Sequence, residues 1–544
     1  MPETLYDAVV AHARQRGGST ALADDAGRVD YRTLSLLADR TAALLRARGL
    51  GAGDVIALQL PNGRPFVAAL LAAGAIGATV QMLHMPYRRA ELATLLRHGR
   101  ARAFVGLRRF KDETPCRTVA ELGIVEQVIE ADELPLAEPP ASGDAPAAAA
   151  IAAPLDPDSR YVLLYTSGTT AEPKGVPVSH RRFVGNAAAS LAPLGVTAAD
   201  VLLPAAPFSH LYGLFVLEMA LLAGACVALL PAYSPDALIA TLRRDRVTAV
   251  FAGPAHFRPL LGAGGAGGAG RVDGAGGAGT AAPMPPADAF AAIRLVCLSG
   301  TAVAPDLARA VEALLPAGRV IQLWGMSELQ AGSYGRPDDP AEIRWLTAGR
   351  PSPGTAFRIR PPDVSAATAP GGSAADLPPG REGRIQVRGP SLFDGYLDNP
   401  AATAAAFDDG WFDTGDLGWL TDDGALVLSG RVKEIINRGG VKFNPIDIEA
   451  IIDRIPGITR SAVVPMPDPV LGERACVFVE TTAPITLAQV VAALEQAGIA
   501  RFKWPERLET IAQMPLTPTQ KVMRGRLTAL LATGQAASGP PVSG

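Results

Sequence analysis

The stretch from residue 160 to residue 193 most constrains how this chain can fold. "RYVLLYT" is apolar and rich in β-branched and aromatic residues, which predicts a buried strand, and "SHRRFVGNAAASLAP" predicts a helix with Ser179 as its N-cap. Between them lies "SGTTAEPKGV", a run of glycines and hydroxyls with one cation, Lys174. A flexible surface loop and a Ser/Thr-rich turn are two interpretations of this run. The flanking elements favour a third, a cradle of backbone N–H groups for phosphate oxygens.

Size and charge exclude several classes of protein. At 544 residues the chain is too long for one hydrophobic core, which predicts two or three domains. Its 50 basic and 53 acidic side chains nearly balance, and no basic block stands out, so we expect no nucleic-acid partner. Cys116, Cys226, Cys297 and Cys476 are scattered singly, which predicts neither a disulfide framework nor a metal site.

Two apolar stretches raise the question of a membrane. Residues 66–83 carry no charge, but they are mostly Ala and Gly, and Gly74 and Gly77 divide them into a helix and a strand. Residues 211–230 carry Glu218 near their centre. Buried core is the favoured interpretation of both stretches, so we expect no membrane partner. The N-terminus lacks an apolar signal region, and a cytoplasmic location is expected.

The order of elements predicts an α/β protein. A helix over residues 31–49, with Leu34, Leu37 and Thr41 on one face, is followed by a strand at 54–60, a helix from Phe66 and a strand at 101–107. This alternation predicts a parallel sheet with helices on both faces. From Gly383 the pattern becomes β-rich, and after residue 433 short helices and strands predict a small α+β domain. Ala/Gly/Pro-rich stretches at 139–154, 262–283 and 363–380 are predicted to be inserted surface loops.

Several short motifs follow the glycine-rich run. A P-loop is disfavoured there, because Lys174 is followed by Gly175 and not by Ser or Thr. The later motifs are "PFSHLYG" (207–213), "LSGTAVAP" (298–305), "LWGMSE" (323–328), "WFDTGDLGWL" (411–420), "LSGRVKEIINRGGVKFNPIDIE" (428–449) and "PLTPTQKVMRGRL" (515–527). In this order they resemble the adenylate-forming (AMP-binding) superfamily, which includes acyl-CoA synthetases, peptide-synthetase adenylation domains and luciferases. The resemblance covers nearly the whole chain.

The resemblance implies a domain plan. It comprises a large N-terminal adenylate-forming domain of helix-flanked sheets with a β-rich subdomain (1–430), a hinge (431–433) and a small mobile α+β C-terminal lid domain (434–530). Residues 531–544 are expected to be a disordered tail.

The resemblance also assigns roles to individual residues. His210 lies between the acyl pocket and the nucleotide, Asp416 accepts hydrogen bonds from the ribose, and Lys521 neutralises charge during adenylation. Glu328 holds Mg2+, which prefers hard oxygen ligands. Arg431 contacts ribose or phosphate, Lys433 is the hinge, and Gly439 and Gly440 line the thiol channel. The remaining nucleotide-binding residues that it implies are Thr166, Ser167, Gly168, Thr169, Thr170, Lys174, Gly300, Thr301, Ala302, Trp324, Gly325, Met326 and Ser327.

The acyl pocket that the resemblance implies comprises His210, Leu211, Tyr212, Phe215 and Gly325. Acetyl-CoA synthetases carry a Trp at the position of Gly325, so we expect space for an acid longer than acetate. Enzymes of 2-hydroxyaryl acids carry an Asn at the position of Leu211, which cannot bond an ortho hydroxyl. The pocket is therefore expected to be apolar, and a medium-chain, alicyclic or aryl acid is favoured.

Three positions depart from the superfamily pattern. Ala171 and Gln520 each replace a glycine, and Ser327 replaces a threonine. A glycine reaches positive φ more readily than other residues, so Gln520 bears on how the loop of Lys521 is presented.

Three functions remain open. The favoured one is a carboxylic acid–CoA ligase that uses ATP, Mg2+ and coenzyme A. The second is an acyl-AMP ligase that loads the phosphopantetheine of an acyl carrier protein, and the third is a non-catalytic nucleotide-binding protein. The third would be expected to lack Lys521 or Glu328, and both are present. A homodimer is among the expected assemblies.

Overall fold

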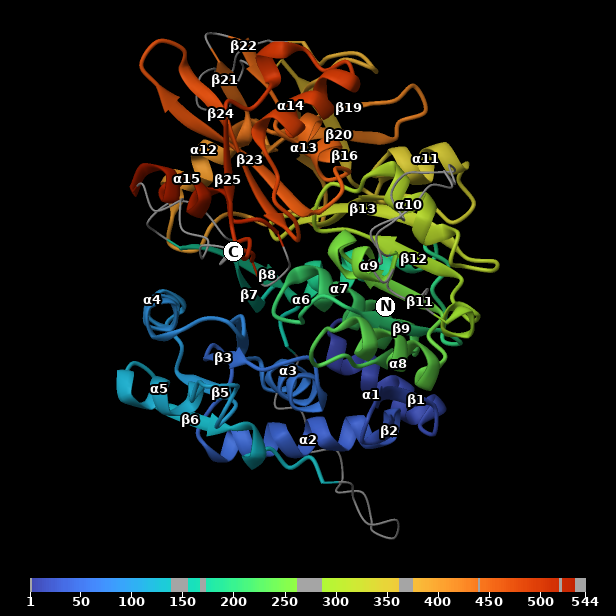
Figure 1. Cartoon of the computed structure of the whole chain (residues 1–544). Coiled ribbons are helices and arrows are strands. Elements are labelled where there is room, and N and C mark those ends of the chain that lie inside the picture. The colour runs from blue at the N-terminus through green and yellow to red at the C-terminus, as the bar shows by residue number, and fades with distance from the viewer. Residues whose placement is uncertain are drawn as a thin grey trace.

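The computed structural model describes residues 2–137, 155–166, 173–261, 286–361, 375–438, 441–517 and 521–533. It is a mixed α/β fold with three sheets in a large N-terminal part and one sheet in a small C-terminal part, which confirms the expected fold class (Figure 1). Of the predicted inserted loops, residues 139–154, 262–283 and 363–374 lie outside the described residues.

The first sheet has six strands in the order β6-β5-β3-β4-β7-β8. Its first five strands are parallel, as the alternation of strands and helices predicted. The strands are β3 (Val55–Gln59), β4 (Thr79–Met82), β5 (Ala103–Gly106), β6 (Gln127–Glu130), β7 (Arg160–Thr166) and β8 (Lys174–Ser179). The accompanying helices are α1 (Leu5–Arg16), α2 (Tyr31–Ala47), α3 (Arg64–Ile76), α4 (Arg89–Gly99) and α5 (Pro115–Leu122).

The strand β8 corrects one expectation. A helix was predicted directly after the glycine-rich run, but β8 pairs antiparallel with β7 first, and Thr166 lies opposite Lys174. The helix α6 (His180–Leu191) then begins where predicted, and the Ser179 side chain accepts from the Arg182 N–H as its N-cap. The alternation in "KGVPVS" buries Val176 and Val178, which is the pattern of a strand and explains the difference.

The second sheet has nine strands in the order β15-β14-β13-β12-β11-β9-β10-β1-β2. The run from β13 to β1 is parallel, and hairpins close it at both ends. The strands are β1 (Thr20–Asp24), β2 (Gly27–Asp30), β9 (Val201–Pro204), β10 (Cys226–Ala228), β11 (Ala249–Ala252), β12 (Leu295–Leu298), β13 (Arg319–Met326), β14 (Gln330–Tyr334) and β15 (Arg350–Pro351). Its helices are α7 (Leu211–Ala223), α8 (Pro235–Asp245), α9 (Pro254–Leu261), α10 (Pro305–Glu312) and α11 (Ala341–Leu346).

Two smaller sheets complete the molecule. The third sheet is antiparallel and accounts for the predicted β-rich region. It contains β16 (Ala356–Arg360), β17 (Gly383–Arg388), β18 (Phe407–Asp408), β19 (Trp411–Leu420) and β20 (Leu426–Arg431), and the helix α12 (Pro400–Ala406) precedes β18. The fourth contains β21 (Ile436–Arg438), β22 (Val441–Phe443), β23 (Ile458–Asp468), β24 (Gly472–Thr481) and β25 (Arg507–Thr510). Its helices are α13 (Ile446–Ile452), α14 (Leu487–Gln496) and α15 (Arg524–Thr533).

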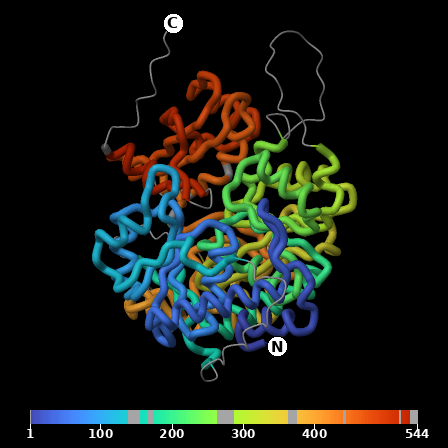
Figure 2. The backbone as a smooth tube through the Cα atoms, turned by 90° about the horizontal axis from the view of Figure 1, so that it is seen from below, coloured from blue at the N-terminus to red at the C-terminus, as the bar shows by residue number. Residues whose placement is uncertain are grey.

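The segment from β21 to α15 has its own apolar core and lies at one end of the molecule, away from α1 and α2 (Figures 1 and 2). The helix α15 continues to Thr533, three residues into the stretch expected to be disordered, because Leu530 and Leu531 pack against the core of this segment. The residues after 533 are outside the described part of the chain.

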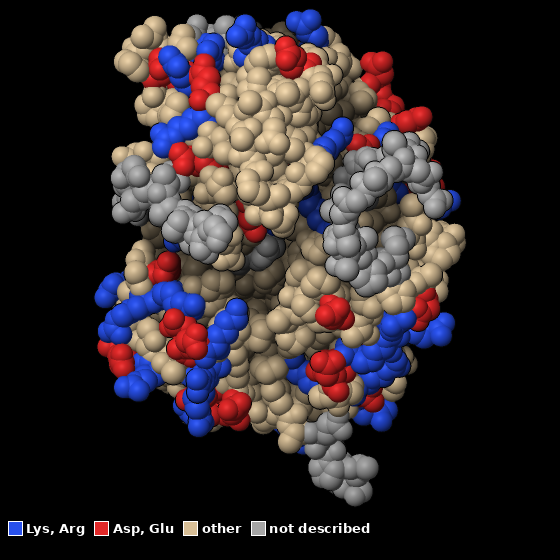
Figure 3. All heavy atoms as spheres, viewed as in Figure 1, with Lys and Arg blue, Asp and Glu red and all other residues tan. Residues whose placement is uncertain are grey.

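Both apolar stretches that raised the question of a membrane are core. The helix α3 is buried from Phe66 to Ile76, and α7 is buried from Leu211 to Leu221. Among the described residues, no helix is both long and apolar enough to cross a membrane. Charges of both signs are interspersed on the face in Figure 3, where the surface is hollowed near the centre, between the two parts of the molecule.

Candidate functional site

The carboxylate of Asp416 is the best-defined polar group of the candidate site. Asp416 is 5% exposed and lies in β19, opposite Arg431 of β20. Its Oδ2 accepts from the Trp324 Nε1–H at 2.8 Å, and the Arg431 Nε lies 2.7 Å from Oδ1. That ion pair does not have good hydrogen-bond geometry, so Oδ1 has a cation beside it but no well-formed hydrogen bond among the described residues. Burial raises the pKa of Asp416, and the nearby positive charges offset only part of this effect.

Lys521, near the other end of the chain, lies in the neighbourhood of this carboxylate. Its main chain is held by Thr517: the Thr517 N–H donates to the Lys521 carbonyl at 2.7 Å, and the Lys521 N–H donates to the Thr517 Oγ1 at 3.0 Å. Burial lowers the pKa of Lys521, and the charge of Arg431 adds to this, while Asp416 opposes it. The cation and the carboxylate are therefore close enough to influence each other's protonation.

His210 also lies near Lys521. It is the N-cap of α7, and its Nδ1 accepts from the Tyr212 N–H at 3.2 Å. Burial lowers the pKa of His210 well below its usual value, and the charge of Lys521 lowers it further. The ring is therefore neutral at physiological pH, and since Nδ1 accepts a hydrogen bond, Nε2 carries the proton. His210 thus presents a neutral N–H donor beside the cation.

Glu328 and Lys174 form the next part of the site. Glu328 is 8% exposed, and its Oε1 accepts from the Tyr396 hydroxyl at 2.9 Å. The Lys174 Nζ lies 4.7 Å from the centre of the Tyr396 ring, so the tyrosine links the two charges. Burial raises the pKa of Glu328, while Tyr396, Arg431 and Lys174 lower it. Tyr396 was not predicted, because nothing in its sequence neighbourhood marks it.

The segment after β12 presents open backbone. Gly300 has φ +95°, and a Cβ at this position would meet no atom within 4 Å. Thr301 and Ala302 are exposed. Met326 and Ser327 lie at the tight turn between β13 and β14. A ligand could therefore approach the main chain at Gly300 without meeting a side chain.

The acyl-pocket candidates cluster on the first two turns of α7. Leu211, Tyr212 and Phe215 are buried, and the Tyr212 hydroxyl donates to the Cys297 carbonyl at 2.8 Å. Gly325 requires a correction: a Cβ there would lie 2.1 Å from the Gln330 carbonyl oxygen, because β13 and β14 approach closely at a bulge. The space expected from a missing indole is therefore not open at this Cβ.

Some predicted residues cannot be placed. Ser167, Gly168, Thr169, Thr170, Gly439 and Gly440 lie outside the described residues, as do Ala171 and Gln520. Thr166 ends β7, and Lys433 lies in the 3-10 turn Val432–Glu434. Sequence reasoning also missed His84, which follows β4 and lies beside His210, with ring centroids 6.4 Å apart. Its place after a buried parallel strand is a signal that could have found it.

Comparisons with known proteins find relatives over most of the chain. A family profile described as AMP-binding enzyme matches residues 9–397, and one described as AMP-binding enzyme C-terminal domain matches residues 447–521. Salicylyl-CoA synthase / salicylate adenylyltransferase of a Streptomyces species is 34% identical over 95% of this chain and 91% of its own length. Medium-chain fatty-acid–CoA ligase of Escherichia coli is 30% identical, covering 94% and 88% of the two chains. Salicyl-AMP ligase / salicyl-S-ArCP synthetase of Mycobacterium tuberculosis is 32% identical, covering 95% and 89%.

Solved structures add information on conformation. ATP-bound MatB from Rhodopseudomonas palustris superposes with a TM-score of 0.81 at 25% identity, over 98% of this chain and 100% of that chain. The apo form of the same protein gives 0.68 over the same shares. As a whole, this chain therefore superposes better on the ATP-bound form than on the apo form. The chain belongs to the AMP-binding enzyme family, in its branch of CoA ligases, which activate a carboxylic acid with ATP and form a thioester.

Proposed function

We propose that this protein joins an apolar carboxylic acid to coenzyme A in two steps, with the residues of the candidate site in defined roles. The observation that carries the proposal is the convergence of Asp416, Lys521 and His210, which come from three distant parts of the sequence. A buried acid, a cation and a neutral hydrogen-bond donor that lie near one another suit a reaction in which two anions meet.

In the first step, a carboxylate oxygen attacks the α-phosphorus of ATP. The bond from this phosphorus to the pyrophosphate oxygen breaks, which gives acyl-AMP and pyrophosphate. Lys521 would neutralise the charge that develops between the two anions, and Asp416 would receive the ribose hydroxyls. Oδ1 of Asp416 supports that role, since its ion pair with Arg431 supplies no well-formed hydrogen bond and a ligand hydroxyl could supply one.

Glu328 is the residue proposed to hold Mg2+. Its carboxylate is buried beside Lys174 and Arg431, and among the described residues no group of three or more potential metal-ligating side chains gathers. This fits a magnesium ion that is bound through one carboxylate and the phosphates of the substrate. When bound, the ion supplies positive charge to the phosphate oxygens. We propose that the same phosphates are contacted by Lys174, Thr166, Ser167, Gly168, Thr169 and Thr170. The adenine is bordered by Gly300, Thr301, Ala302, Gly325, Met326 and Ser327. Arg431 contacts ribose or phosphate.

In the second step, the thiol sulfur attacks the acyl carbon, the bond to AMP breaks, and the thiol proton leaves to solvent. The thiol must approach where Lys521 now stands, so the C-terminal domain has to rotate. We place the hinge at Lys433, between domains 1–430 and 434–530, with Gly439 and Gly440 entering the thiol channel after rotation.

Leu211, Tyr212 and Phe215 favour an apolar acyl group, and the name of the Escherichia coli relative supports a medium-chain acid. A second candidate function is supported by the name of the Mycobacterium tuberculosis relative, which indicates an aryl carrier protein as acceptor. Both candidates use the same first step and differ in the thiol.

Acid-dependent exchange of pyrophosphate into ATP tests the first step across a panel of acetate, hexanoate, octanoate, cyclohexanecarboxylate and benzoate. We expect exchange with the longer acids and little with acetate. Acyl-CoA formed with free coenzyme A would favour the ligase, and transfer only to a phosphopantetheinylated carrier would favour the second candidate. ATP binding without exchange for any acid would contradict both.

A further inference from the structure

His84 stands at the end of β4 in a loop that the protein holds in place. Gln59 of β3 is fully buried, and its Nε2 lies within hydrogen-bond distance of three carbonyl oxygens of this loop: His84 at 3.0 Å, Met85 at 3.4 Å and Tyr87 at 3.1 Å. A buried amide at this place fixes the main chain that carries His84. The position of the imidazole is therefore built into the fold.

The His84 ring is fixed as well. Its Nδ1 lies 2.8 Å from the Oγ of Ser209, which is 4% exposed and directly precedes His210. On the other side the ring lies 5.1 Å from the Tyr87 ring, measured between centroids. No hydrogen bond is found for Nε2 among the described residues, and this atom is not among their buried unpaired groups. Nε2 is thus free to bond a ligand.

The imidazoles of His84 and His210 form a pair. Their centroids are 6.4 Å apart and their planes differ by 25°, so the rings are nearly parallel. Burial lowers the pKa of His84 to about 4, so both rings are neutral at physiological pH. Both Lys521 and His84 lower the pKa of His210 further, so both lie near its ring.

We propose that His84 is a specificity-determining residue that selects, among acids whose acyl group is otherwise apolar, those with one neutral hydrogen-bonding group, such as a hydroxyl, a few ångströms from the reacting carboxylate. This inference rests on the proposed function, in which His210 borders that carboxylate. The α7 residues of the pocket cannot supply the contact, because Leu211 and Phe215 are apolar and the Tyr212 hydroxyl is already bonded to Cys297. With their ring centroids 6.4 Å apart, His84 and His210 are near enough for one small acid to contact both imidazoles.

Matched acid pairs that differ by one hydroxyl test the proposal. Suitable pairs are benzoate and salicylate, hexanoate and β-hydroxyhexanoate, and cyclohexanecarboxylate and its ortho-hydroxy derivative. Pyrophosphate exchange should give a kcat/KM at least about tenfold higher for the hydroxylated member of one or more pairs, the ratio expected when a ligand group satisfies a buried partner. His84→Leu should reduce that ratio to near one, whereas His84→Gln, which keeps hydrogen-bonding groups, should retain part of it.

Controls separate this inference from folding and from the proposed function. His12→Leu removes a histidine of α1 that bonds the Leu222 carbonyl at the far end of α7, and it should leave the ratio unchanged. If plain acids support exchange but no pair shows a preference, or if His84→Leu leaves the ratio unchanged, His84 does not select the acid although the ligase stands. An effect on the KM of coenzyme A alone would also overturn the proposal. Loss of exchange for every acid in the wild-type protein would instead contradict the proposed function.

Discussion

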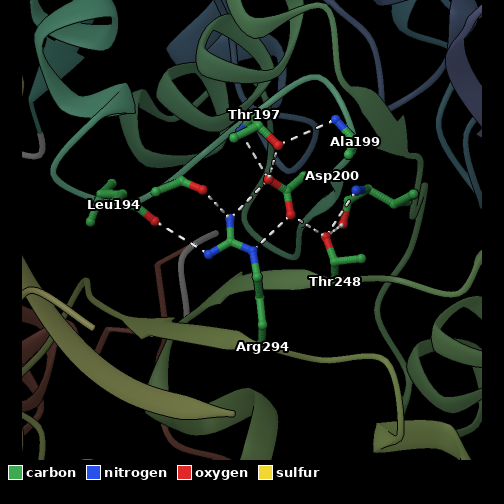
Figure 4. Close-up of polar contacts among 8 residues, drawn as sticks. Leu194, Thr197, Ala199, Asp200, Thr248 and Arg294 are labelled. Atoms are coloured by element: carbon green, nitrogen blue, oxygen red, sulfur yellow. Dashed lines mark hydrogen bonds and ion pairs between the residues drawn. The ribbon is translucent and has the colours of Figure 1, made fainter. Parts of the chain in front are cut away.

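Asp200 and Asp416 are two carboxylates that are equally buried, at 5% exposure, in very different surroundings. Both oxygens of Asp200 accept hydrogen bonds from the Arg294 guanidinium, at 2.8 and 2.9 Å. The carboxylate also accepts from the Thr197 N–H at 2.9 Å and from the Thr248 hydroxyl at 2.7 Å (Figure 4). Burial alone would raise the pKa of Asp200, but these donors hold it below its usual value. The protein itself satisfies this acid.

Asp416 has fewer hydrogen-bond donors than Asp200. Trp324 donates to one oxygen, the other has an ion pair without hydrogen-bond geometry, and the pKa of the carboxyl is raised. The exposed fraction is the same in both places although Asp416 lies deeper in the protein, so exposure alone does not distinguish a structural acid from one that awaits a ligand. The number of donors that the fold supplies does distinguish them.

The largest effect on activity should come from replacing Lys521, the cation near Asp416. Lys521→Ala should lower acid-dependent pyrophosphate exchange about 100- to 1000-fold, the range for removing one charge-stabilising group from an active site. Thioester formation from synthetic acyl-AMP should fall far less, because Lys521 must leave before the thiol arrives. Equal loss in both assays would contradict the assignment of Lys521 to the first step only.

Asp200→Asn should affect stability and not catalysis. It weakens a network that the fold completes and leaves the Arg294 guanidinium without its counter-charge, so we expect the free energy of unfolding to fall by about 2–3 kcal/mol. Denaturant titration measures this loss, and the KM for ATP should not change. A raised KM with unchanged stability would show that the comparison between the two acids is wrong.

Glu218 extends the comparison to an acid with no partner. It is fully buried in α7, neither oxygen has a hydrogen-bond partner among the described residues, and burial raises its pKa well above the usual 4.5. A raised pKa in the folded state means that the protein loses stability as pH rises above the unfolded value, until the folded pKa is reached.

Glu218→Gln removes this titration, so its stability relative to the wild type should increase with pH. Between pH 6 and pH 7 the difference should grow by about 1.4 kcal/mol while the folded carboxyl stays protonated. Thermal unfolding of both proteins across that interval measures it. A constant difference would mean that Glu218 ionises normally in the folded protein.

Much of the candidate site could be predicted from the sequence, and the local nature of its motifs explains both what could be predicted and what could not. The motifs are local, so residues such as Asp416, Glu328 and Lys521 could be found one stretch at a time. Their partners come from elsewhere: Trp324 is 92 residues from Asp416, and Tyr396 is 68 residues from Glu328. Only the folded chain brings such pairs together.

Gly325 shows the same limit from the opposite direction. Its sequence context suggested space for a larger side chain, but the backbone of β14 occupies the position of its Cβ. A local pattern reports which residue is small and not what stands next to it. Replacing Gly325 with Trp would therefore disturb the hairpin of β13 and β14 as well as the acyl pocket, and it is a poor test of acid preference.

Asp416→Asn should reduce nucleotide binding without the stability loss of Asp200→Asn. One acceptor becomes a donor that faces the donor groups of the ribose, which should raise the KM for ATP about tenfold. The preference for ATP over 2′-deoxyATP should shrink at the same time, because the contact to the 2′-hydroxyl weakens. An unchanged preference, with a lowered melting temperature, would make Asp416 a structural acid like Asp200.

The smallest effect should come from two ion pairs that join the C-terminal segment to the N-terminal part in this arrangement. Arg258 of α9 contacts Asp453, which follows α13, at 2.9 Å, and Arg454 contacts Asp306 of α10 at 2.6 Å. Partly exposed pairs contribute about 0–1 kcal/mol each, so Arg258→Ala with Arg454→Ala should shift the balance away from the adenylating arrangement only about two- to fivefold. The rate of thioester formation relative to pyrophosphate exchange should rise by that factor, and the rise should vanish in about 1 M salt, which screens the pairs in the wild type as well.

Arg309→Ala is the matched control, because Arg309 contacts the same Asp306 from within α10 at 3.0 Å and joins no domains. An equal shift in that control would mean that the charge of Asp306 acts locally and that the two pairs do not hold the domains together.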